Sequence, residues 1–478
     1  MKPHLFFAAA ILSISSIRAA YGQDTVKITG RIDNRMSDTL KIKYNTSKIA
    51  YFPTEITLVT DNKGHFATAF NLPAHEFTAV ELYHGSHIAE LLLQPGDSLS
   101  LRADCSRFDS SITYSGRGAA ASNFVALHTI TMGRMNQYSV RVREAINKEP
   151  DGFLPAIDAE KKKEYDFLER HKKGLPDNFI KYWRSFYEYY NYFFTEQYPQ
   201  VHQMLKVRHI SDTIPDTNYT VLSGLPIKLH DDLLQLPPYL LYLTGLYETK
   251  LKAAGYTFPL KDTLLARRFQ DSVNHLVALN FPARSAEFYF AQQLYGNLRA
   301  QPLWVSHRDY TYFTARWPNS TYLPPIDKQL AIAERLAPGM PAPDITVTTE
   351  AGKTVKLSDL KGKVVYIDFW AGWCKQCVGE LVRGQKMKVL FKDKPVEFVN
   401  LSLNEDTTMD NGLIRKYKLE GGFKTLTGGW SSEEIQQFAV QSIPAYYLID
   451  ADGKIALQHA PSPMQSTQLS LEIGKLLK

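Results

Sequence analysis

The chain has 478 residues, too many for a single hydrophobic core, so we expect two or three domains. Its net charge of +6 is mild, and no basic cluster alternates with aromatic residues as on a nucleic-acid-binding face, so no nucleic-acid partner is expected. With 3 cysteines in the whole sequence, the fold cannot depend on a disulfide framework.

Residues 1–22 have the pattern of a secretory signal peptide. Lys2 supplies a positive start, residues 5–17 are apolar, and small residues precede a predicted cleavage after Gly22. No later stretch approaches the length of an apolar membrane span, so no transmembrane segment is expected after cleavage. The mature protein is therefore predicted to be exported to a bacterial periplasm or cell envelope.

Residues 23–115 are predicted to be rich in β-strands. Short segments with alternating apolar residues are separated by turn sequences at 61–64 and 94–97. Strands at this spacing are typical of a small β-sandwich. This region also contains Cys105, which is expected to lie half-buried at a strand end.

From residue 116 to 335 the apolar positions recur at helical spacing. Asp177 can cap a helix over 178–198, where eleven of the twenty-one residues are aromatic, and we expect these rings to pack in a core. Further helices are predicted at 233–254, 263–279 and 283–299. We interpret the region as an all-helical spacer or docking domain without a catalytic group.

Residues 336–478 alternate strands and helices, which predicts an α/β domain with a mixed central sheet. The chain is therefore expected to be multidomain, with a sandwich-like β-rich domain and an all-helical middle region before this α/β domain. The predicted strands are 364–369, 396–403, 446–449 and 454–457, and the predicted helices are 374–391, 410–417, one capped by Ser431 with Glu434 in a capping box, and one at the C-terminus.

Cys374 and Cys377 follow the first of these strands and begin the first helix. Residues at i and i+3 share a helix face, so the two sulfurs can close a small ring. Unpaired amides and the helix dipole at the N-terminus favour a thiolate on Cys374, which makes it the attacking sulfur, with Cys377 as the resolving thiol. A zinc site would need a second pair of ligands, and no CxxC, HxxxH or CxxH pattern follows.

Five motifs in the C-terminal third carry a family resemblance, at 337–344 (APGMPAPD), 357–363 (LSDLKGK), 369–374 (FWAGWC), 441–444 (QSIP) and 448–454 (LIDADGK). On these motifs, the C-terminal third resembles the TlpA-like disulfide reductases, a thioredoxin-fold family that includes the cytochrome c maturation thioredoxins. The β-rich region resembles the domain that often precedes thioredoxin modules in exported proteins of Gram-negative bacteria.

The resemblance implies roles for further residues. Asp368 stands where thioredoxins carry a buried acid that shuttles the proton of the resolving cysteine, and burial in an apolar strand would raise its pKa. The alternative is an acid that merely ends a strand. Pro444 matches the family's cis-proline, which would expose the backbone of Ile443 to a substrate beside the sulfurs. An ordinary trans turn is the alternative. Together with Trp373, Ile443 and Pro444 are expected to form the docking surface.

Three positions are candidates for tuning the redox pair. Lys375 and Gln376 stand between the cysteines, where many relatives have a proline before the second one. The cation of Lys375 favours the reduced form and indicates a less reducing couple. Glu380 either tunes Cys377 or faces solvent.

The sequence thus predicts an exported thiol-disulfide oxidoreductase. The resemblance implies a reductase that acts on disulfides of periplasmic proteins, receives electrons from a membrane donor, and needs no cofactor beyond the Cys374–Cys377 disulfide. A disulfide oxidase or isomerase, and a partner-binding protein with a redox-sensing module, remain alternatives. Peroxidase activity is a minor one, because Ala371 replaces the threonine that peroxidases carry.

Overall fold

The computed structural model describes residues 25–49, 53–72, 77–206, 228–253, 263–300, 303–349, 351–404 and 407–477. The predicted signal peptide lies outside the described residues. The chain divides into two compact units, the first ending at Gln292 and the second running from Gln293 to Lys478. Within the described residues, no helix is both long enough and apolar enough to cross a membrane.

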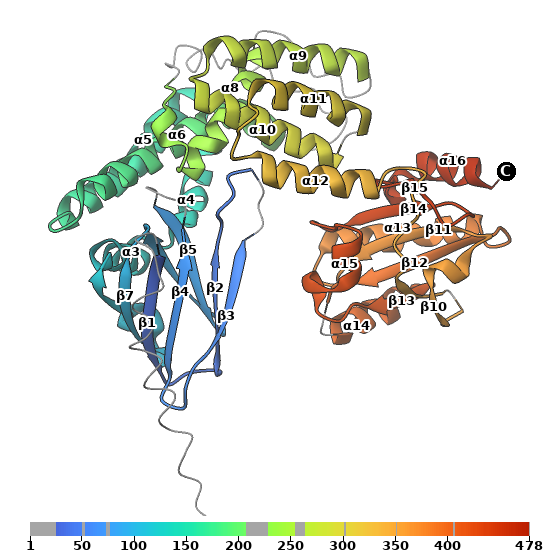
Figure 1. Ribbon diagram of the computed structural model, residues 1–478, viewed down its shortest axis with the longest axis horizontal. Coiled ribbons are helices and arrows are strands. Elements are labelled where there is room, and N and C mark those ends of the chain that lie inside the picture. The colour runs from blue at the N-terminus through green and yellow to red at the C-terminus, as the bar shows by residue number, and fades with distance from the viewer. Residues whose placement is uncertain are drawn as a thin grey trace, which may run out of the picture. The chain divides into compact units, whose positions relative to one another are not determined.

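The N-terminal strands form two four-stranded sheets with one shared core (Figure 1). The orders are β4-β1-β7-β8 and β3-β2-β5-β6, and the only parallel pair within these two sheets joins β1 to β7. Val26 and Leu99 of one sheet and Ile42 and Leu82 of the other are at most 2% exposed, so apolar alternation builds the interior. The β-rich sandwich is confirmed. The strands are β1 Thr25–Asp33, β2 Thr39–Tyr44, β3 Thr54–Val59, β4 His65–Asn71, β5 Thr78–His84, β6 His87–Leu93, β7 Ser98–Asp104 and β8 Thr113–Arg117.

Helices follow the sandwich, as predicted, except for α2, which lies between β7 and β8. The predicted aromatic helix runs over Asp177–Lys206, and its Phe179, Trp183 and Tyr187 are fully buried, so these rings form core. The helix predicted from residue 233 begins at Pro237, because proline fits the first turn of a helix. The helices are α2 Phe108–Ser111, α3 Ala119–Met132, α4 Tyr138–Ile146, α5 Pro150–His171, α6 Asp177–Lys206, α8 Pro237–Ala253, α9 Thr263–Asn280 and α10 Ala283–Ala300, with short 3-10 turns at Cys105–Arg107, Met135–Gln137 and Asp231–Leu233.

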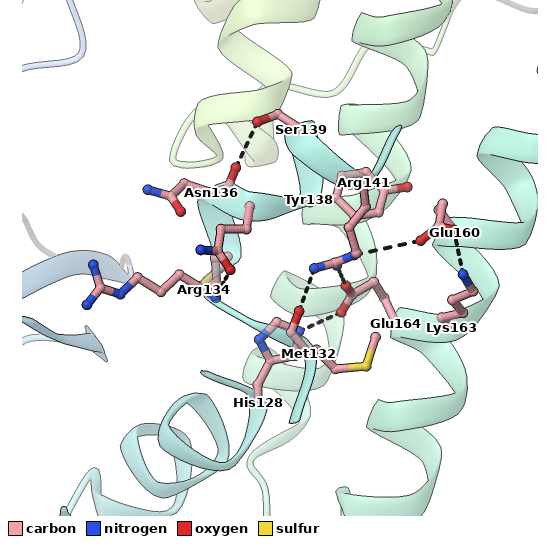
Figure 2. Close-up of polar contacts among 12 residues, drawn as sticks. His128, Met132, Arg134, Asn136, Tyr138, Ser139, Arg141, Glu160, Lys163 and Glu164 are labelled. Carbon is pink, nitrogen blue, oxygen red and sulfur yellow. Dashed lines mark hydrogen bonds and ion pairs between the residues drawn. The ribbon is translucent and has the colours of Figure 1, made fainter. Parts of the chain in front are cut away.

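A buried polar cluster ties three of these helices together (Figure 2). His128 Nε2 of α3 lies 2.8 Å from Glu164 Oε2 of α5, and both side chains are fully buried. Arg141 of α4 donates to the other carboxylate oxygen of Glu164 and, over 2.7 Å, to the carbonyl oxygen of Met132. A charge buried in an apolar core is tolerated only when it is paired in this way, so the cluster fixes how α3, α4 and α5 meet.

The second unit contains a mixed five-stranded sheet of order β13-β12-β11-β14-β15, preceded by helices and a small hairpin (Figure 1). The central strand β11 is parallel to β12 and antiparallel to β14. The α/β thioredoxin fold expected for the C-terminal third is confirmed. The elements are α11 Leu303–Arg316, α12 Leu323–Arg335, β9 Thr346–Thr348, β10 Thr354–Lys356, β11 Val364–Trp370, α13 Lys375–Leu390, β12 Val396–Ser402, α14 Thr407–Tyr417, β13 Gly422–Thr425, α15 Glu433–Gln437, β14 Ala445–Ile449, β15 Ile455–Leu457 and α16 Ser466–Leu476, with 3-10 turns at Leu357–Leu360, Gly429–Ser431 and Pro463–Gln465.

The cap predicted for α15 is wrong by one residue. Ser432, not Ser431, accepts the capping hydrogen bond from the N–H of Ile435, while Ser431 ends a preceding 3-10 turn. Glu434, predicted to complete the capping box, instead pairs with Lys424 at 2.7 Å. Tandem serines give equivalent capping signals, so the sequence does not distinguish them.

The two faces of β11 enter different cores. Ile367 and Phe369 pack with residues of α15 on one face. Val364 and Tyr366 pack on the other face with Met387 of α13 and with residues of α16. Because side chains alternate along a strand, Asp368 lies on this second face. The acid therefore shares a face with the residues that α13 covers.

Candidate redox site

The turn between β11 and α13 presents the two cysteines at the start of a helix. Cys374 is the N-cap of α13, and its Sγ accepts a hydrogen bond from the N–H of Cys377 over 3.2 Å. The two residues are joined by a disulfide, so the structure represents the oxidised pair. Cys374 is half-buried whereas Cys377 is 1% exposed. Cys374 is therefore the more exposed of the two cysteines.

The predicted docking residues flank the disulfide in different ways. Ile443 and Cys374 pack at the edge of an apolar cluster that contains Cys377. The peptide bond between Ile443 and Pro444 is cis, as expected. Trp373 is 53% exposed immediately before Cys374. These side chains thus place apolar surface beside the accessible sulfur.

Asp368 is buried beneath the site with 3% exposure. Burial raises the pKa of its carboxyl group to about 8, against a lowering by the cation of Lys388. Its Oδ1 has no hydrogen-bond partner among the described residues. The side chain lines a cavity of about 10 Å³ together with Leu381 and Asn400, and this is the space that one water molecule needs. Asp368 can therefore exchange a proton near neutral pH.

Of the three tuning candidates, Lys375 and Gln376 are exposed on the first turn of α13, and Glu380 is not. Of the two alternatives for Glu380, the one in which it faces solvent is wrong, because the side chain is 2% exposed. Its carboxylate accepts from the N–H of Met464 over 2.8 Å and from the hydroxyl of Ser462 over 3.3 Å. The segment before α16 covers Glu380, and the local sequence around the cysteines could not indicate this.

A third acid near the cysteines was not predicted. Asp410 of α14 is 3% exposed, and its Oδ1 accepts from the N–H of Gly372 over 2.9 Å. Asn404 and Ser402 donate to the same carboxylate. No local sequence signal indicates this contact, because the pairing of β11 with β12, which sets Trp370 opposite Ser402, forms only in the folded sheet.

Among the residues that the structure describes, no three His, Cys, Asp or Glu side chains are grouped to hold a metal ion. A strand that leads into a disulfide at a helix N-terminus, with a cis-proline loop beside it, defines a thioredoxin-fold dithiol-disulfide site.

The matching family model and a relative in sequence agree with this class. The Redoxin family model matches residues 337–469. Thiol-disulfide oxidoreductase ResA from Bacillus thuringiensis subsp. konkukian is 32% identical over 143 residues, which are 30% of this chain and 80% of that protein. The thioredoxin domain of a Bacteroides vulgatus thiol-disulfide oxidoreductase is 26% identical, with a TM-score of 0.27, over 30% of this chain and 99% of that one. A thiol:disulfide interchange protein from a Bacteroides species is 26% identical, with a TM-score of 0.27, over 29% of this chain and 91% of that one.

The similarity to ResA extends over most of that relative at an identity that establishes common family. Through its C-terminal domain, this chain belongs to the ResA- and TlpA-like family of thiol-disulfide oxidoreductases.

Proposed function

We propose that this protein is an exported reductase for disulfides in periplasmic partner proteins, and that Cys374 and Cys377 carry the reaction. The supporting observation is the unequal exposure of the two cysteines, with Cys374 half-buried and Cys377 1% exposed. A two-step exchange requires an attacking thiolate that is more accessible than the shielded resolving thiol.

The reduced pair reacts in two steps. The thiolate of Cys374 attacks one sulfur of the partner disulfide, which forms a mixed disulfide and releases the other partner sulfur as a thiolate. Cys377 then loses its proton and attacks the Sγ of Cys374. This closes the Cys374–Cys377 disulfide and releases the second partner thiolate. The partner gains two electrons, and the pair loses two.

Asp368 is proposed to accept the proton of Cys377. A group with a pKa of about 8 is partly ionised near neutral pH, so it can take up and return a proton there. The buried acid lies on the face of β11 that α13 covers, and Cys377 stands in the first turn of that helix. The water-sized cavity beside Asp368 provides a place for a bridging water.

The partner is proposed to dock on Trp373, Ile443 and Pro444. A partner segment can pair with the backbone at Ile443 while its apolar side chains contact the exposed Trp373. No further cofactor is invoked. Because each turnover leaves the pair oxidised, a membrane electron donor is proposed to reduce it again.

Cysteine variants test this proposal. The C374S chain should reduce no insulin disulfide and trap no partner, whereas the C377S chain should accumulate mixed disulfides that reducing agent releases. Substitution of Cys105 by serine is the control, since this buried cysteine lies in the β-rich domain. If the C374S and C377S chains both kept full cellular function, the alternative of a partner-binding protein would replace the enzyme.

The direction of electron flow is tested by the reduction potential of the pair. Titration against glutathione or dithiothreitol, read by alkylation and mass spectrometry, should give a value near or below about −250 mV for a thioredoxin-like reductant. A value above roughly −180 mV would indicate an oxidase or isomerase, the outcome that the cation of Lys375 favours.

A further inference from the structure

Asp410 is a buried carboxylate whose partners converge on the turn before Cys374. Its Oδ1 accepts from the N–H of Gly372 over 2.9 Å and from Nδ2 of Asn404 over 3.1 Å. Its Oδ2 accepts from the hydroxyl of Ser402, which itself accepts from the N–H of Asn404 over 3.1 Å. Each of these groups donates a hydrogen bond to the carboxylate, so both of its oxygens have partners although the residue is only 3% exposed.

The residue at 372 leaves room for this contact. A Cβ on Gly372 would lie 2.4 Å from Oδ1 of Asp410 and 3.0 Å from Cγ of Met409. Since real side chains do not approach so closely, a larger residue would displace either the carboxylate or the turn. Glycine at 372 and aspartate at 410 therefore fit each other across a sequence gap of 38 residues.

We propose that Asp410 is a positioning residue for the redox pair, which acts through the N–H of Gly372 to fix the turn that presents Cys374 at the N-terminus of α13. The inference rests on the proposed function and deepens it, because it assigns a residue on α14 to the geometry of the dithiol. Asp410 touches the turn and not the sulfurs, so its effect reaches the reaction only through their placement.

Placement of the sulfurs determines how readily the ring closes. One reduced pair and one glutathione disulfide give the Cys374–Cys377 disulfide and two glutathione thiols, and the equilibrium constant of this exchange measures the effective concentration of one sulfur at the other. A turn without its acceptor samples more conformations, so the effective concentration falls.

The experiment measures this constant in the full chain by alkylation and mass spectrometry. Asp410→Ala should lower it about tenfold, which corresponds to a potential about 30 mV less negative. Asp410→Asn keeps an oxygen acceptor for Gly372 without the charge, and it should restore the constant to within about threefold of the unaltered chain. A purely structural role would not give this pattern, because loss of stability alone leaves the exchange constant of the folded protein unchanged.

Two further variants serve as controls. Ser402→Ala removes one hydrogen bond from the same carboxylate but leaves the bond to Gly372, so it should lower the melting temperature without moving the constant. Gly372→Ala should reproduce the fall seen with D410A, and the double variant should fall no further, because both changes break one contact.

A folded D410A chain with an unchanged constant overturns the inference. So does a D410N chain that falls as far as D410A, since the carboxylate would then act through its charge. The proposed function fails separately, if the unaltered chain closes no internal disulfide or reduces no protein disulfide.

Discussion

The carboxylate of Glu380 accepts a hydrogen bond from the backbone N–H of Met464 over 2.8 Å, which joins the first half of α13 to the segment before α16. This buried acid lies close enough to Asp368 to affect it. Burial is the main cause that raises the pKa of Asp368 to about 8, and the charge of Glu380 raises it further. The helix that carries Cys377 thus also carries a group that adjusts the acid of β11.

Glu380→Gln should lower the pKa of Asp368 below its value of about 8, because the variant removes a like charge and keeps an acceptor for Met464. The measurement is a pH titration of the Asp368 carboxyl carbon by NMR in the oxidised protein. Ser462→Ala is the matched control, since it removes a hydrogen bond from Glu380 but not its charge. An unchanged titration midpoint in the E380Q chain would show that the two acids do not interact.

Asp368 should make the stability of its domain depend on pH. Its pKa is about 8 in the folded protein against 3.8 as the ordinary value, so the folded state binds the proton more tightly than the unfolded state does. Between pH 3.8 and about pH 8, the folded state loses stability by about 1.4 kcal/mol for each unit by which the pH rises. The loss levels off above the pKa of the folded state. Asp368→Asn is neutral at every pH and should lose this dependence.

The test compares hydrogen exchange of β11 peptides in the oxidised chain and in the D368N variant from pH 5 to pH 9. The advantage of D368N in opening free energy should grow with pH and become constant above pH 8. Asp410→Asn serves as the comparison variant, because it replaces a buried acid whose carboxylate accepts hydrogen bonds from three donors. A constant difference between D368N and the unaltered chain across the range would mean that Asp368 is ionised throughout.

Local patterns predicted the central elements well. The strand at 364–370 is buried along its whole length, and its β-branched and aromatic residues already indicate this. The helix predicted to begin at Cys374 begins one residue later, at Lys375, and Cys374 is its N-cap. Both features depend on residues that are close in sequence. Periodicity and capping signals act over this short range.

Contacts between distant segments could not be predicted in the same way. Gly372 and Asp410 lie 38 residues apart, and Ser462 and Glu380 lie 82 residues apart. No spacing rule connects such positions, because the sheet and the covering helices bring them together only after folding. The i to i+3 spacing between Cys377 and Glu380 therefore could not indicate that Glu380 is buried.

Loss of the buried cluster in the helical region should destabilise that region strongly. Glu164 pairs with His128 and with Arg141 while fully buried, and Glu164→Gln removes the charge that both partners face (Figure 2). We expect the free energy of unfolding to fall by about 3 kcal/mol, since breaking a buried pair leaves an uncompensated charge. The measurement is urea unfolding, monitored by hydrogen exchange of α5 peptides.

Asp166→Asn is the control on the same helix, because its pair with Lys162 is exposed on both sides. This change should alter stability by no more than about 0.5 kcal/mol. Equal effects of E164Q and D166N would contradict a structural role for the buried cluster.

Lys375 should make the redox pair less reducing than it would otherwise be. Its exposed cation follows Cys374 directly and stabilises a thiolate there, which favours the reduced form. Lys375→Ala should therefore shift the equilibrium toward the disulfide by roughly threefold, or about 15 mV toward more negative potential at pH 7. The shift should shrink at high salt, because ions screen exposed charges. Lys386→Ala removes an exposed charge further along α13 and should leave the potential unchanged. Equal shifts in the two variants would mean that net charge, and not the position beside Cys374, determines the potential.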